Sequence, residues 1–109
     1  MADTLKVLGQ VAPSATTNTD LYTVPDNTVA TVSSIAACNR SSGALTFRVA
    51  VRPSGATVVN EHYIYYGKSV AANDTVFIIV GITLSENDVI TVYASSGDMS
   101  FSIFGVETS

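Results

Sequence analysis

Cys38 and His62 are the residues whose types could support nucleophilic catalysis, and each is the only one of its kind in the chain. A thiol nucleophile needs a base and an orienting group within hydrogen-bond reach. His62 follows Glu61 in a strand-like segment, so these two side chains are expected to point to opposite faces. Cys38 lies among small residues, where a thiol is more often a buried filler. The sequence predicts no enzyme, and a Cys38–His62 dyad is the alternative that it leaves open.

The sequence also lacks the spacing of a metal or cofactor site. One cysteine and one histidine do not supply a zinc cage, and neither a calcium-loop pattern nor a glycine-rich phosphate loop occurs. Four acidic residues fall in expected turns, where acidic side chains favour hydrogen bonds to the local backbone: Asp26, Asp74, Glu86 and Asp88. We therefore expect no metal and no cofactor.

Three tyrosines are the best candidates for recognition. Tyr63, Tyr65 and Tyr66 occur within four residues, and Tyr22 and Tyr93 are further candidates for the same cluster. Tyrosine combines apolar area with a hydrogen-bonding hydroxyl and is enriched at interfaces. Strict alternation predicts that Tyr63 and Tyr65 lie opposite Tyr66. The alternative for each tyrosine is packing in the core or across strands.

The segment 44–52 alternates without interruption, which predicts a strand with one buried and one exposed face. Arg48 and Arg52 lie on the exposed face and are predicted to contact another subunit, the alternative being a solvated face. The buried face is expected to carry four side chains: Leu45, Phe47, Val49 and Val51.

Turn signals recur every eight to twelve residues from residue 21 onward, and no segment has a helical pattern. This predicts an all-β protein, a single antiparallel β-sandwich of about eight strands with jelly-roll or immunoglobulin-like character. The small residues of segment 29–39 place Val32, Ala36 and Cys38 on one face and suggest a strand covered on both sides. The apolar segment 75–80 is likewise expected to be buried on both faces.

The composition fits one domain of 109 residues that hides part of its surface. It is 47% hydrophobic and only 13% charged, against about 25% charged in an average soluble domain. A subunit of an assembly explains this, as does a small domain with a Ser/Thr/Asn surface. The net charge of −4 argues against nucleic acid as a partner. We expect no signal peptide, since residues 1–10 lack a basic segment followed by an apolar run. We expect no membrane insertion, since the longest near-apolar run, 76–82, is too short to cross a bilayer.

Residues 1–20 differ from the rest and are expected to form an N-terminal arm or a first strand plus loop, followed by the sandwich domain of residues 21–109. Leu5, Val7 and Val11 alternate around a glycine, and the polar segment 12–20 follows them. These three apolar residues are the candidates for an assembly arm that adds to a neighbouring subunit.

Several segments occur in an order that is familiar from one group of proteins. They are LYTVP (21–25), ACNR (37–40), TFRVAVRPSGA (46–56), HYIYY (62–66), AANDT (71–75), GITL (81–84) and FSIFGVE (101–107). In these segments the chain resembles the small virion structural proteins of tailed bacteriophages, which include head-decorating cement proteins and accessory β-domains of tail fibres and baseplates. The resemblance covers nearly the whole chain from Leu21 onward.

This resemblance implies a non-enzymatic structural subunit of the head or of the tail and baseplate. It implies a homo-oligomer, with a trimer as the first expectation, that binds other capsid or tail proteins. Such a protein is made in the host cytoplasm and resides in the virion. The alternative function is an adhesin module of a tail fibre that binds a host-surface glycan through the tyrosines.

Overall fold

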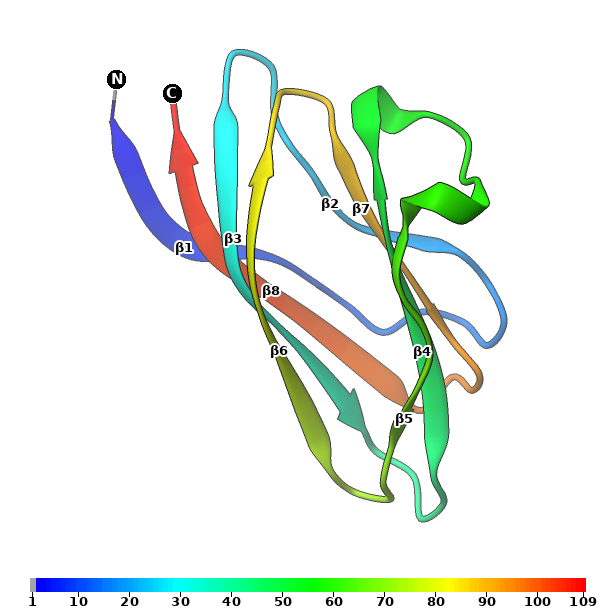
Figure 1. Ribbon diagram of the computed structural model, residues 1–109. Helices are drawn as coiled ribbons and strands as arrows, with labels where there is room; N and C mark the ends of the chain where they lie inside the picture. The colour runs from blue at the N-terminus through cyan, green and yellow to red at the C-terminus, as the bar shows by residue number, and fades with distance from the viewer. Residues whose placement is uncertain (1) are drawn as a thin grey trace.

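The computed structural model describes residues 2–109 and shows eight β-strands in two facing sheets (Figure 1). Two short 3-10 turns, η1 (Pro53–Gly55) and η2 (Asn60–His62), lie between β4 and β5. The prediction of an antiparallel β-sandwich of about eight strands is confirmed. The strands are β1 (Asp3–Val11), β2 (Thr19–Thr23), β3 (Val29–Asn39), β4 (Leu45–Arg52), β5 (Tyr63–Val70), β6 (Thr75–Leu84), β7 (Val89–Ala94) and β8 (Met99–Thr108).

The order of the strands distinguishes between the two expected kinds of sandwich. One sheet, called sheet A, has the order β1-β8-β3-β6, and the other, called sheet B, has the order β2-β7-β4-β5. The pairs β1–β8, β2–β7, β3–β6 and β4–β5 are all antiparallel neighbours. The chain is thus a long hairpin that alternates between the two sheets, which is the jelly-roll arrangement and not the immunoglobulin one.

The core forms where the alternating apolar residues of the two sheets meet. Phe47 and Val49 of β4 are completely buried, as the alternation of segment 44–52 predicts. The ring of Phe47 lies edge-on to Phe101 of β8, with 5.7 Å between the ring centroids, and so joins sheet B to sheet A. Such aromatic pairs stabilise beyond the area that they bury.

Three of the predicted turns contain an asparagine in the left-handed backbone region, which asparagine tolerates better than most residues. Asn27, Asn73 and Asn87 have φ values of 57°, 56° and 66°. The first and third of these turns are neighbours, because the N–H of Asn87 donates to the carbonyl of Val24 at 2.9 Å. At these three positions the chain therefore reverses where its turn residues predict.

The N-terminal segment is an edge strand of sheet A within the chain itself. β1 pairs with β8 from Asp3 opposite Thr108 to Val11 opposite Phe101. A loop then crosses to sheet B, where the N–H of Thr16 donates to the carbonyl of Ala94 at 2.8 Å. Of the two expectations for residues 1–20, the single chain forms the first strand plus loop.

The predicted burial of β3 and β6 on both faces is wrong for the single chain. Phe77 of β6 faces outward and is 64% exposed. Val32, Ala36 and Cys38 do not share a face either, since the register shifts between Val32 and Ser34. Val32 therefore points into the core, while Ala36 and Cys38 face outward. The outer face of sheet A is left uncovered.

Candidate functional site

The structure does not bring the two potentially nucleophilic residues together. Cys38 is partly exposed on the outer face of sheet A, between Ala37 and Asn39, which are buried. His62 lies in η2, beside sheet B, and its Nδ1 accepts a hydrogen bond from the N–H of Val59 at 3.3 Å. Within residues 2–109, no hydrogen bond joins the thiol of Cys38 to the imidazole of His62.

The acidic side chains in the turns accept hydrogen bonds from backbone N–H groups. The carboxylate of Asp88 accepts hydrogen bonds from the N–H groups of Ser54 and Ser85, at 2.8 and 2.9 Å. Asp74 accepts one from the N–H of Thr75 at 2.8 Å. Within the described part of the chain, no three histidine, cysteine or acidic residues form a group able to hold a metal ion.

The predicted faces of the tyrosines are wrong, because an irregularity in β5 lies between Tyr63 and Tyr65. The register with β4 shifts between Val49 and Ala50 and again between Phe47 and Arg48. Such bulges reverse the alternation of side chains. Tyr65 therefore points inward, with its ring centroid 6.2 Å from that of Phe47, whereas Tyr63 and Tyr66 form an edge-to-face pair at 5.0 Å.

Arg48 lies between two tyrosine rings on the outer face of sheet B. It is in register with Tyr66 of β5 on one side and with Tyr93 of β7 on the other. Its guanidinium carbon is 4.1 Å from the centroid of each ring. A planar cation stacks favourably on an aromatic face. Arg48, Tyr63, Tyr66 and Tyr93 together are called the arginine–tyrosine patch below.

The arginine–tyrosine patch covers part of the sheet beneath it. Ala50, which alternation places on the exposed face, is only 1% exposed, and it is in register with Tyr63 of the patch. Tyr66 itself remains 65% exposed at the surface of the patch. The patch is therefore a covering layer with an open outer side.

Arg52 is engaged within the chain. It forms an ion pair with Asp20 at 2.9 Å and donates to the hydroxyl of Thr91 at 3.2 Å. It also donates to the carbonyls of Gly55 and Ala56, at 2.9 and 2.7 Å. Arg52 thus ties β4 to β2 and to the η1 turn, and it has little capacity left for a partner.

Tyr22 belongs to a separate network between the sheets. Its hydroxyl donates to Glu107 of β8 at 2.6 Å, and Lys6 of β1 forms an ion pair with the same carboxylate at 3.2 Å. Burial, together with this hydrogen bond, raises the pKa of Tyr22 above its usual range. The hydrogen bond from Tyr22 lowers the pKa of Glu107, with a smaller contribution from Lys6.

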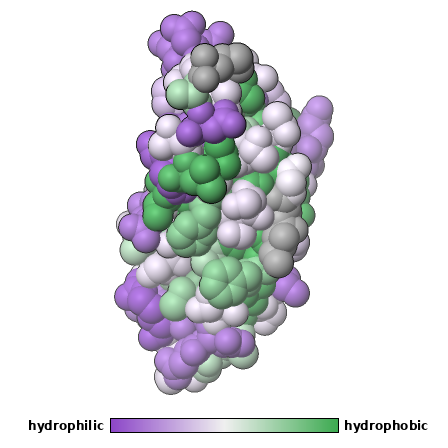
Figure 2. All heavy atoms as spheres, turned by 90° about the vertical axis from the view of Figure 1, so that its left-hand side faces the viewer, coloured by the Kyte–Doolittle hydropathy of each residue, from purple (hydrophilic) through white to green (hydrophobic). Residues whose placement is uncertain are grey.

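The outer face of sheet A combines exposed apolar side chains with serine and threonine residues and carries few charges. Leu5 and Val7 of β1, which are candidates for the assembly arm, are 81% and 48% exposed there, while Val11 packs against the core. Figure 2 shows this side of the molecule, where hydrophobic atoms gather along the middle and hydrophilic atoms concentrate mainly at the two ends. Among the side chains that the structure describes, the exposed apolar residues of this face are Leu5, Val7, Val29 and Phe77, with Phe104 and Val106 partly exposed between them.

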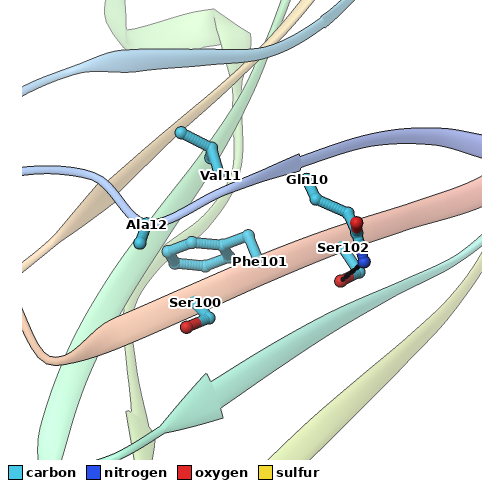
Figure 3. Close-up of a pocket in the computed structure, with 6 residues that line it drawn as sticks. All are labelled: Gln10, Val11, Ala12, Ser100, Phe101 and Ser102. Atoms are coloured by element: carbon cyan, nitrogen blue, oxygen red, sulfur yellow. Dashed lines mark hydrogen bonds between the residues drawn. The ribbon is translucent and has the colours of Figure 1, made fainter.

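A shallow pocket of about 330 Å³ lies where β1 separates from β8 (Figure 3). Its polar rim contains Gln10, whose side chain donates to the hydroxyl of Ser102 at 3.2 Å. Arg40 donates to the hydroxyl of Ser100, another lining residue, at 2.8 Å. The pocket contains no titratable lining group. Its lining residues are Gln10, Val11, Ala12, Ser100, Phe101 and Ser102.

The comparisons with known proteins find neither a matching family model nor a significantly similar curated protein. Among residues 2–109, no helix is long and apolar enough to span a membrane. What this chain does is therefore inferred from its own surfaces.

The arrangement around Arg48 could be predicted only in part. Arg48, Tyr63 and Tyr66 are candidates on sequence grounds. Tyr93 is only a further candidate there, and its contact with Arg48 follows from the pairing of β4 with β7. The available signal is that Tyr93 alternates with buried residues of β7, which places it on an outer face.

Proposed function

We propose that this protein is a non-enzymatic structural subunit of a tailed-phage virion that binds further copies of itself through the outer face of sheet A. The observation that carries the proposal is the exposure of Leu5, Val7, Val29 and Phe77 on that one face. Exposed apolar side chains that gather on one surface mark interaction sites. The resemblance to phage structural proteins supplies the kind of particle.

The charge distribution favours a second copy as the occupant of this face. Among the described residues, few charged side chains lie at the outer face of sheet A. Asp3 lies at one corner, where its carboxylate accepts a hydrogen bond from Thr108, and Arg40 lies at the other end, where it donates to the hydroxyl of Ser100. A chain with a net charge of −4 repels its own copies where charges meet. Contact through a face with so little charge keeps this repulsion small, and interface cores are depleted of charge in general.

The sequence pattern supports the same face. β3 has small residues on both sides, and β6 is apolar over residues 76–80, both of which are typical of strands covered on both faces. The single chain covers only their inner side, since Phe77 is 64% exposed and Val29 is 44% exposed. A second copy on sheet A supplies the missing cover.

The proposal is tested by measuring molecular mass in solution for the protein and for a Phe77→Lys variant. The expected result is a multiple of 11.4 kDa for the parent chain and a single-chain mass for the variant. Thr46→Lys, at an exposed position on sheet B, is the matched control and should leave the mass unchanged. A single-chain mass for the parent at high concentration would overturn the proposal. Detection of the subunit in a map of the phage particle tests its place in the head, tail or baseplate.

An adhesin module that binds a host glycan is the second candidate function, and the exposure of Tyr66 favours it. Replacement of Tyr63 and Tyr66 by alanine distinguishes the two functions. Loss of cell binding with assembly intact favours the adhesin. If both assembly and cell binding are unchanged, the result favours the structural subunit that assembles through sheet A. Tyr65→Ala is unsuitable for this purpose because its ring packs against Phe47.

A further inference from the structure

We propose that the arginine–tyrosine patch binds the carboxylate of an acidic sugar, such as a hexuronic acid unit of a polysaccharide. Arg48 binds the carboxylate, and the neighbouring ring of Tyr66 contacts the apolar face of the pyranose. This inference rests on the second candidate function and names the chemical class of its glycan. It does not depend on the proposed assembly, because the site lies on sheet B and the assembly uses sheet A.

The guanidinium of Arg48 is held between two tyrosine rings, and its N–H groups are left to bind a ligand. Within residues 2–109 it forms no hydrogen bond and no ion pair, although Arg40 and Arg52 each form several. No buried side-chain nitrogen or oxygen in that part of the chain lacks a partner. The N–H groups of Arg48 are therefore open to solvent.

The two tyrosines determine which part of Arg48 a ligand can reach. Tyr66 and Tyr93 cover the flat faces of the guanidinium at 4.1 Å, so its N–H groups are accessible only in the plane of the cation. Two parallel N–H donors in one plane match the two oxygens of a carboxylate. Because the rings fix this plane before binding, less conformational entropy is lost when the ligand binds.

The charge near the site favours a monoanion. A phosphate monoester carries nearly two negative charges, whereas Arg48 supplies one positive charge. The nearest cation on the same strand face, Arg52, is already paired with Asp20. The net charge of the chain is −4. A carboxylate is therefore neutralised at this site, while a phosphate leaves excess negative charge on an acidic protein.

The aromatic surface beside Arg48 favours a sugar as the carrier of the carboxylate. Tyr66 is 65% exposed, and the plane of its ring makes an angle of 86° with that of Tyr63. The two rings are therefore nearly perpendicular to each other, and each carries a phenolic hydroxyl. A pyranose presents C–H groups on its face and hydroxyls at its edge. Tyrosine, with an apolar ring and a polar hydroxyl, matches both.

The test is a titration of the full chain with trigalacturonic acid, followed by NMR through the side-chain Nε–H signals of the arginines. We expect the Arg48 signal to shift with a dissociation constant in the millimolar range, while the signals of Arg40 and Arg52 remain in place. Galactotriose, the neutral counterpart, and inorganic phosphate are expected to leave the Arg48 signal nearly unchanged at the same concentrations.

Variants separate the contributions of charge, geometry and stacking. Arg48→Lys keeps the charge but loses the planar pair of donors, so binding should weaken on the order of tenfold. Tyr66→Leu should weaken it several-fold, and Arg40→Gln, on sheet A, should leave it unchanged. Equal binding of the neutral sugar, unchanged binding by Arg48→Lys, or tighter binding of phosphate would overturn the proposal. Binding of a glutamate-rich peptide at lower concentration than the acidic sugar would also overturn it, in favour of a protein partner.

Discussion

The hydroxyl of Tyr22 on β2 donates a 2.6 Å hydrogen bond to the carboxylate of Glu107 on β8, which links sheet B to sheet A across 85 residues of sequence. Tyr22 is 7% exposed, so little water competes for this bond. The bond stabilises the ionised form of Glu107 and the protonated form of Tyr22. The stability of the fold should therefore depend on pH at both ends of the range.

We expect Tyr22→Phe to destabilise the protein by about 1.5–3 kcal/mol, since it removes a hydrogen bond to a charged group. The folded pKa of Glu107 is lowered below 4.5, so its stabilisation is present above that pH and is lost as pH falls through the folded pKa. The folded pKa of Tyr22 is raised above 10.0, so its stabilisation is present below that pH and is lost as pH rises through the folded value. Urea unfolding over a range of pH should show that the free energy of unfolding of the variant falls less steeply at acid and at alkaline pH than that of the parent. Equally steep limbs would contradict this assignment, and Tyr93→Phe is the matched control.

Phe47→Ala should destabilise the fold by about 3–5 kcal/mol, because its fully buried ring leaves a cavity between Phe101 and Tyr65. Phe77→Ala removes the same side chain from an outer face and should change the stability of the dilute protein by no more than about 0.5 kcal/mol. Chemical unfolding of the two variants checks both values. Similar losses for the two variants would contradict the assignment of faces in β4 and β6.

These two phenylalanines also show how far the sequence predicts the fold. Strict alternation in segment 44–52 correctly buried Phe47 and Val49, because no bulge interrupts β4 between these residues. Phe77 was wrongly expected to be buried, because an apolar strand has the same appearance whether its cover comes from the same chain or from another. Composition alone does not identify the source of that cover.

The candidate site on sheet B could be predicted only in part for a different reason. The residue types were informative, but a bulge changes which side chains share a face. The bulge in β5 between Tyr63 and Tyr65 brings Tyr63 and Tyr66 to the same face and turns Tyr65 inward. The contact between Arg48 and Tyr93 depends on pairing between strands that are far apart in sequence. Such pairing follows from the jelly-roll order, which local turn signals do not specify.

Gly105→Ala should destabilise the fold by about 1–3 kcal/mol, because a Cβ atom at this position would overlap the carbonyl oxygen of Thr31 on the neighbouring strand. The side chain of Leu8, at 3.1 Å from the same Cβ position, limits adjustment from the other side. Gly81→Ala, in β6, meets nothing within 4 Å and is the control, with an expected change within about 0.5 kcal/mol. Thermal unfolding of both variants is the measurement, and equal midpoints would show that β8 can move away from β3.

Cys38 provides a probe of the surface that we propose to be an assembly interface. It is the only cysteine, and it lies partly exposed on the outer face of sheet A, in register with Thr75 and Ser100. A thiol-specific reagent should therefore label it slowly in the assembled protein and several-fold faster in the Phe77→Lys variant. The labelling rate of the unfolded chain gives the upper limit, and Thr46→Lys should label as slowly as the parent. If the parent and the Phe77→Lys variant label at the same rate while their masses differ, the copies meet on another surface, because contact across sheet A would shield the face from which this thiol projects.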